Sequence, residues 1–205
     1  MIVYRSDQRP LVDTCQSLGM GPDATQKYIS YYNKKMDAIK LGGRNGYRDS
    51  DKTKVYKSEW AMQKQVKIKQ FKDINAAEKR AKQIMNSKLW SDLQGRQVYI
   101  KNNRRMGRAT AGLAHEGGKI ELGTTGMNEY VLIHEMCHQL PNCMHHSVQF
   151  RINLLKLTSR FISTEAAKIL KAEFKERKLK ISHSKPKSPA SWFKSYQHME
   201  KIRNV

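Results

Sequence analysis

Apolar residues recur every three or four positions over long parts of this chain, with polar residues between them. This is the pattern of amphipathic α-helices, which bury one face and expose the other. It predicts helices over residues 23–41, 58–71, 73–93 and 166–180, and a short terminal helix from Trp192 onward. The polar stretch 44–57 and the proline-containing stretch 182–191 predict surface connections.

A different pattern occupies residues 97–122. Short runs rich in β-forming residues are separated there by glycine-bearing turns, which predicts strands at 97–101, 109–114 and 119–122. A small sheet of about three strands among helices makes α+β the expected fold class. The turn between the first two strands carries Arg104 and Arg105.

The pattern His-Glu-x-x-His lies inside an apolar run, at His134, Glu135 and His138. Two histidines four residues apart share one face of a helix, so both imidazoles can bind one metal ion. Zinc is the default ion for such a pair, and Glu135 is placed to take the proton from a zinc-bound water as general base. A buried helix must give its ionisable groups partners, which favours a metal site over an incidental motif.

The ends of this helix and the third zinc ligand are also suggested by the sequence. The segment 124–126 predicts the start of the helix, and Pro141 predicts its end. A further apolar-periodic run begins at Val148, so His145 and His146 stand at the entrance of a second helix. Other candidates for the third ligand are Cys143, Glu165 and Glu173, whereas Cys137 is interpreted as a small buried residue.

The motif and its surroundings resemble the SprT-like (Spartan-type) zinc metalloproteases. In that family the third ligand opens a His-Gly-x-x-Phe segment, which here reads His146-Ser147-Val148-Gln149-Phe150, with Ser147 at the usual glycine. The stretch 107–122 looks like the hairpin that precedes the catalytic helix of the family. No cysteine follows Cys143, so the cysteine-rich zinc ribbon that often follows the protease core is not expected.

The resemblance covers about residues 73–160 and implies a minimal zincin-like fold. It also implies that His134, His138 and His146 hold the zinc and that the substrate is unfolded or extended protein. The expected organisation has four parts: a basic helical extension over 1–72, the SprT-like core over 73–160, a basic helix over 161–181, and a linker with a short helix over 182–205.

The net charge of the chain bears on its binding partners. The chain has 39 Lys and Arg residues against 18 Asp and Glu residues, a net charge of +21. Such an excess favours a polyanionic partner, with nucleic acid (DNA) first and an anionic membrane surface second, although a solvated basic surface is the plain alternative. The three cysteines make no disulfide framework, which indicates an intracellular compartment, cytoplasmic or nucleic-acid-associated. Neither a secretory signal nor a membrane span is expected.

These observations predict a zinc-dependent metalloprotease with Glu135 as general base, acting in a nucleic-acid-associated setting. The donor to the oxyanion is left open among Arg104, Arg105, His115 and Tyr130. The main alternative is a basic nucleic-acid-binding protein whose zinc site is structural or inactive. A zinc hydrolase acting on a nucleic acid or a cell-wall amide is a weaker third reading.

Overall fold

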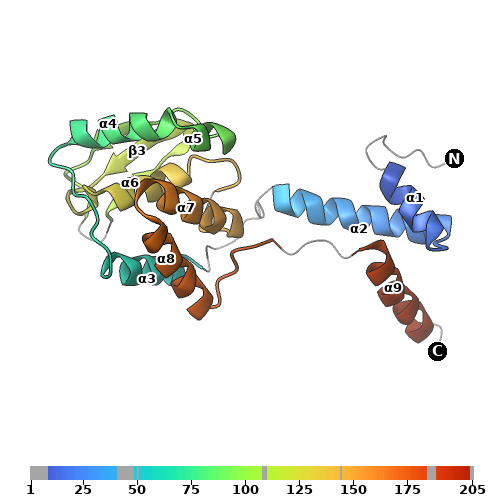
Figure 1. The fold of residues 1–205 in the computed structure, drawn as a ribbon. Coiled ribbons are helices and arrows are strands. Elements are labelled where there is room, and N and C mark those ends of the chain that lie inside the picture. The colour runs from blue at the N-terminus through green and yellow to red at the C-terminus, as the bar shows by residue number, and fades with distance from the viewer. Residues whose placement is uncertain are drawn as a thin grey trace. The chain divides into compact units, whose positions relative to one another are not determined.

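The computed structural model describes residues 9–40, 49, 51–107, 110–143, 145–183 and 188–203 (Figure 1). The chain divides into two compact units, one of Met1–Leu41 with Ser184–Val205 and one of Gly42–His183. These differ from the four expected parts, because residues 49–72 group with the core and the terminal helix groups with the N-terminal helices. Parts of the connections expected at 44–57 and 182–191, and residues 108 and 109 of the expected hairpin, lie outside the described residues.

The first unit contains the helices α1 (Arg9–Ser17), α2 (Pro22–Lys40) and α9 (Pro189–Arg203). Tyrosine side chains of α2 pack inward: Tyr28 is buried, and its ring centroid lies 5.4 Å from that of Trp192 on α9. Trp192 in turn stacks on Tyr196 at 5.1 Å. The terminal helix therefore packs on the N-terminal helices through aromatic contacts.

The second unit is built on a small mixed sheet. Its strands β1 (Tyr99–Asn102), β2 (Gly112–Ala114) and β3 (Lys119–Leu122) follow the order β1-β3-β2, with β1 parallel and β2 antiparallel to β3. Between β2 and β3, Gly117 and Gly118 have φ angles of 80° and 90°, which glycine adopts at little cost. The expected α+β class is confirmed.

The structure describes six helices in the second unit. They are α3 (Lys52–Gln63), α4 (Ile74–Met85), α5 (Lys88–Asp92), α6 (Glu129–Cys137), α7 (Val148–Phe161) and α8 (Thr164–Glu176). Five of these helices are capped at the start, because a side-chain oxygen of the preceding residue accepts a backbone N–H of the first turn. The capping residues are Asp73, Ser87, Asn128, Ser147 and Ser163. The described part of the chain holds no helix that is long and apolar enough to cross a membrane.

Several helix boundaries differ from the expected ones. Helix α1 was not expected, α9 begins at Pro189 rather than at Trp192, and α8 ends at Glu176 rather than at 180. Residues 52–57, expected in a surface connection, belong to α3.

The helix expected at 58–71 is α3, which starts and ends earlier. The apolar pattern misplaced it because its inward face includes the polar residues Ser58 and Glu59 and so lacks a clear apolar stripe. The helix expected at 73–93 is interrupted where Ser87 caps α5. The segment 124–126 forms a separate 3-10 turn before α6.

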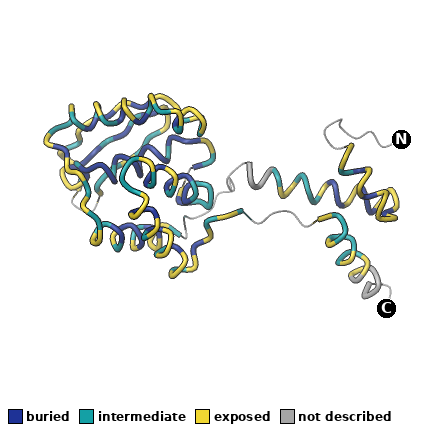
Figure 2. The backbone as a smooth tube through the Cα atoms, viewed as in Figure 1, coloured by how far each residue is buried: buried dark blue, intermediate teal, exposed yellow. Residues whose placement is uncertain are grey.

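Helix α6 lies at the centre of the second unit. All its residues except Val131 are buried, and it packs against β2, β3, α4 and α7 (Figures 1 and 2). Arg80 of α4 pairs with the buried Glu129 in the first turn of α6 and donates to the carbonyl of Phe161 at 3.0 Å. A helix held on all sides in this way gives its side chains fixed positions.

Candidate metal centre

His134 and His138 project from successive turns of α6. The side chain of Asn128 starts this helix by accepting the Val131 N–H at 3.0 Å, and His138 stands at its C-terminal cap. His146 comes from the loop before α7, directly ahead of Ser147, whose hydroxyl accepts the Phe150 N–H at 3.2 Å. The serine at the glycine position of the resembled motif is therefore the cap of α7.

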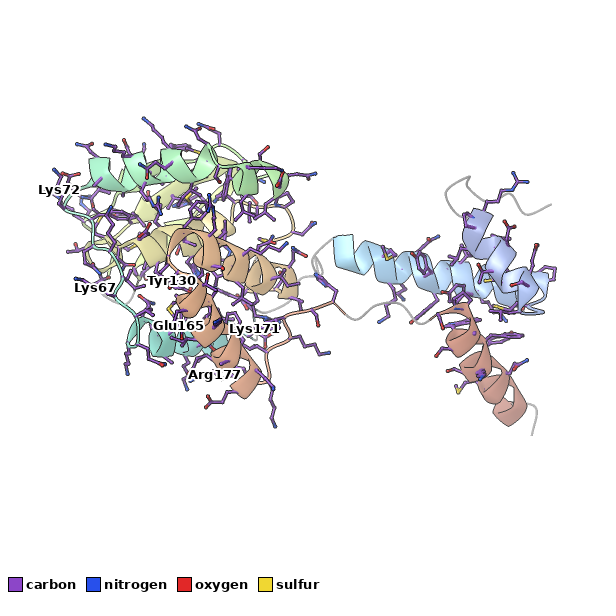
Figure 3. All side chains as sticks on the ribbon, viewed as in Figure 1. Lys67, Lys72, Tyr130, Glu165, Lys171 and Arg177 are labelled. Carbon is purple, nitrogen blue, oxygen red and sulfur yellow. The ribbon has the colours of Figure 1, made fainter. Side chains whose placement is uncertain are left out.

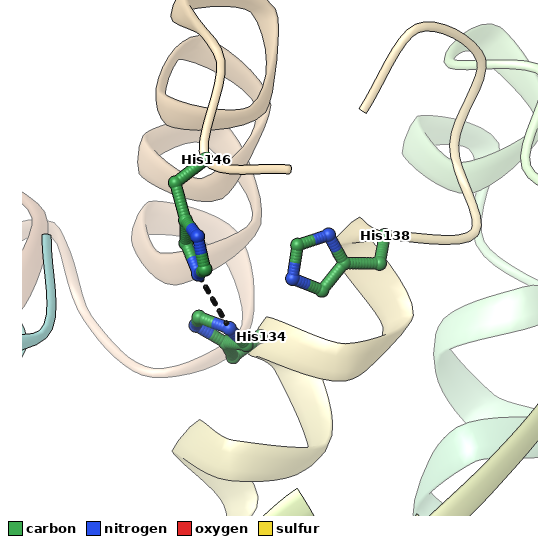
Figure 4. A group of neighbouring side chains, drawn as sticks. All are labelled: His134, His138 and His146. Atoms are coloured by element: carbon green, nitrogen blue, oxygen red, sulfur yellow. Dashed lines mark hydrogen bonds between the residues drawn. The ribbon is translucent and has the colours of Figure 1, made fainter. Parts of the chain in front are cut away.

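The three imidazoles converge (Figure 4). One ring nitrogen from each of His134, His138 and His146 lies within 4.8 Å of the other two, and the Nε2 atoms of His134 and His146 are 3.3 Å apart. Two nitrogens bound to one tetrahedral zinc at about 2.0–2.1 Å lie roughly 3.4 Å from each other. This buried group of histidines could therefore bind a metal ion.

Each imidazole is held from behind at Nδ1. Glu59 Oε1 lies 2.8 Å from Nδ1 of His134, and Asp49 Oδ2 lies 2.6 Å from Nδ1 of His146. The carbonyl oxygen of Cys143 lies 2.9 Å from Nδ1 of His138. These oxygens act as acceptors, so each Nδ1 donates and each Nε2 is available to a metal. Such partners fix the ring orientation and raise the basicity of a histidine ligand.

A buried arginine fixes the loop that carries His146. Arg151 Nη1 donates to the His146 carbonyl at 2.7 Å and to Asp51 at 2.8 Å, and its Nε donates to the Lys180 carbonyl at 2.8 Å. The Asp49 carboxylate also accepts the His146 backbone N–H at 3.2 Å. The segment before α3 is thereby tied to the metal-ligand loop by two carboxylates.

The three histidines differ in their protonation. Burial lowers the pKa of His134, but the carboxylates around it, Glu59 foremost and then Glu135 and Asp49, together outweigh burial and raise that pKa to about 9. Burial and the adjacent imidazoles hold the pKa of His138 well below its usual value. The pKa of His146 is also lowered, by burial and by His134, against the pull of Asp49. At neutral pH, His134 is thus the histidine whose proton a metal would displace.

Glu135 lies beside the histidines and directly under the edge strand β2. It is buried, and burial raises the pKa of its carboxyl, while the charge of His134 and a backbone hydrogen bond from Ala114 lower it. A Cβ atom on Gly112 would come within 2.7 Å of Glu135 Cγ and 2.8 Å of its Oε1. The strand can therefore pass this close to the carboxylate because residue 112 has no side chain.

Sequence reasoning missed the contribution of α3. Besides Glu59, this helix supplies Tyr56, whose ring centroid lies 5.0 Å from that of His146 and 5.6 Å from that of His134. Burial, with Glu135 and Glu59 nearby, raises the pKa of Tyr56 to about 12. The Tyr56 hydroxyl has no hydrogen-bond partner among the described residues. No local pattern in the sequence links these residues to a motif more than 70 positions away.

The remaining ligand candidates lie apart from the three histidines. His145 is exposed, with a left-handed φ of 59°, and Glu165 is exposed in the first turn of α8. Glu173 pairs with Arg177 within α8. Cys143 and Cys137 are fully buried, and the sulfur of Cys143 accepts from Asn153 at 3.3 Å. None of these side chains belongs to the metal-ligating group found among the described residues.

The candidate oxyanion donors are also placed by the structure. Tyr130 is buried in the core with Glu59 nearby, Arg104 and Arg105 are exposed, and His115 lies 3.4 Å from Glu121. Within the described residues, no hydrogen bond or ring contact joins any of them to the three histidines.

Comparisons with known protein families, with curated proteins and with solved structures find no match to this chain.

Proposed function

We propose that this protein is a zinc-dependent metalloprotease. The observation that carries the proposal is the convergence of His134, His138 and His146 beside a buried glutamate, Glu135, under an exposed sheet edge. The same residues carry the SprT-like resemblance, so we assign the second unit to a minimal zincin-like fold of that kind.

The donor set favours zinc in a catalytic rather than a structural role. Three neutral imidazoles with one open position form a common catalytic zinc site, whereas structural sites are usually closed by a fourth Cys or His. Among the described residues, His145 is exposed and the sulfur of Cys143 is turned to Asn153, so neither closes the site. Each histidine also has the Nδ1 acceptor that metal-ligating histidines usually have.

When bound, zinc supplies a water whose pKa is lowered to about 7 and polarises the carbonyl to be cleaved. Glu135 accepts the proton of the attacking water at its carboxylate and then delivers it to the leaving amine. Its raised pKa suits both roles. The free edge of β2 offers main-chain hydrogen bonds that align an extended peptide beside Glu135.

Cleavage of an unfolded basic protein by the zinc-loaded chain tests this proposal. Glu135→Gln removes the proton acceptor but leaves the histidines in place, so we expect cleavage to fall by at least a hundredfold while zinc stays bound. Glu165→Gln makes the same charge change at an exposed position and should keep full activity. A wild-type protein that binds zinc but cleaves no better than Glu135→Gln would contradict the proposal.

The second candidate is a basic nucleic-acid-binding protein with a structural or inactive zinc site. The net charge of +21 favours it. Nucleic-acid binding that persists in wild type and Glu135→Gln alike, with no cleavage by either, would make it the better account.

A further inference from the structure

Charge is segregated along the stretch that includes α3. Three acidic residues lie between positions 49 and 72, and all of them pair inward: Asp49 with His146, Asp51 with Arg151, and Glu59 with His134. The lysines of the same stretch are all exposed: Lys52, Lys54, Lys57, Lys64, Lys67, Lys69 and Lys72. Figure 3 labels Lys67 and Lys72 on the connection from α3 to α4. The exposed charged residues of this stretch are therefore all lysines.

Aromatic rings interrupt this cationic surface on α3. Trp60 is 61% exposed, unusual for so large an apolar side chain, and its ring is stacked with that of Tyr56 at 6.4 Å and 19°. Lys52 Nζ lies over the Tyr56 ring at 5.7 Å. Lys57 and Lys64 stand three residues before and four residues after Trp60, so they flank it on one side of the helix.

We infer that this face of α3, formed by Lys52, Tyr56, Lys57, Trp60 and Lys64, binds single-stranded nucleic acid. A base stacks on the exposed Trp60 ring, and the neighbouring phosphates pair with Lys57 and Lys64, which are about 10.5 Å apart along the helix axis. Proteins that bind single strands without reading their sequence use this arrangement, in which aromatic side chains that stack on bases alternate with cations that pair with phosphates.

The observations favour a single strand over a duplex or an acidic peptide. The bases of a duplex are stacked on each other and leave no free face for Trp60, and an acidic peptide needs the lysines but not the rings. Among the described residues, Lys57 and Lys64 have no ion-pair partner, so their charges are available to phosphates. The inference deepens the proposed function by naming the partner beside the metal centre, because Tyr56 contacts both His134 and His146.

A binding assay on the full-length Glu135→Gln protein tests this face without interference from cleavage. The probe is a fluorescent oligo-dT strand, titrated at several salt concentrations. Trp60→Ala should weaken binding about tenfold, and Trp60→Phe should restore most of it, because base stacking rather than charge is lost. Lys57→Gln with Lys64→Gln should reduce the slope of log K against log salt by about 1.4, since each phosphate contact on a single strand contributes about 0.7.

The matched control removes two lysines from another helix. Lys171→Gln with Lys175→Gln on α8 changes the net charge equally at exposed positions, and it should leave the Trp60-dependent part of binding intact. Circular dichroism checks the fold of each variant, and Trp60 is exposed enough for its removal to be tolerated.

Three results would overturn the inference. One is oligo-dT binding that is unchanged by Trp60→Ala. Another is equal loss of affinity in the α3 and α8 lysine variants, which would show only a general charge effect. The third is a Trp60→Ala variant, made in the active background, that raises KM for a peptide substrate without weakening oligo-dT binding, because the face would then be a peptide site. Because binding is measured without cleavage, a failure here is distinguishable from a failure of the protease proposal.

Discussion

Replacing Glu59 by glutamine tests whether α3 supports the metal centre. The Glu59 carboxylate lies 2.8 Å from Nδ1 of His134, and both side chains are almost fully buried. Glutamine keeps the size and an acceptor oxygen, so the ring orientation is preserved, but the negative charge that makes His134 a stronger ligand is lost. Loss of such a partner typically lowers metal affinity about 10- to 100-fold.

We expect Glu59→Gln to lie near the lower limit of this range, at about tenfold, or about 1.4 kcal/mol. Glu59→Ala also removes the acceptor and should approach about a hundredfold. Zinc affinity is measured by competition with a chromophoric chelator above pH 9, where His134 is neutral in wild type and variants alike, because at lower pH the loss of Glu59 would also remove the proton that competes with zinc. Glu165→Gln is the matched control, because that carboxylate is exposed and belongs to none of the contacts around the histidines.

An affinity of Glu59→Gln within twofold of wild type would refute the reasoning. It would mean that His134 is held by its packing in α6 alone. A loss of helix content in the variant, seen by circular dichroism, would instead show that Glu59 acts on folding, and the Glu59→Ala comparison would then have no bearing on the metal.

Three further predictions concern the same centre. Gly112→Ala should displace Glu135 and reduce peptide cleavage more than tenfold with zinc still bound, whereas Gly107→Ala, which has open space around it, should be silent in the same assay. The pKa of His134 is raised to about 9, so below that pH zinc must displace its proton. Calorimetry in buffers of different ionisation enthalpy should show release of about one proton at pH 7.5, with affinity falling about tenfold per pH unit from pH 9 towards 7, and uptake or no exchange would contradict this. Zinc at 100 times its Kd should stabilise the protein by about 2.7 kcal/mol, which raises Tm by roughly 5–11 °C in a thermal scan, and a chelator should reverse the shift.

The residues of the site that could be predicted from the sequence lie close to one another in it. His134 and His138 are one helical turn apart, and His146 follows after a short loop, so spacing and capping signals place all three. Asp49 and Glu59 lie 97 and 75 positions from the histidines that they hold. Their roles arise from tertiary packing of α3, which leaves no periodic trace in the sequence.

The fold was predicted where each element buries a simple apolar face. Strand β3, which alternates buried and half-buried residues, and helix α4, with Ala77, Ala81 and Ile84 buried, meet this condition. Helix α3 does not, because its buried side combines Val55 and Met62 with Ser58 and Glu59. The apolar residues used to predict a helix at 58–71 include Trp60, which is exposed, and Phe71, which lies beyond its end.

The long separation between the metal-ligand loop and its carboxylate partners also bears on how the chain folds. Contacts between distant residues form late, because closing a long loop costs chain entropy before any contact repays it. Burying the Glu59 carboxylate before His134 is in place would leave a charge without a partner in the core, which is costly. Docking of α3 and completion of the histidine cluster should therefore occur in one cooperative step, and a metal ion would find its full set of ligands only at the end of folding.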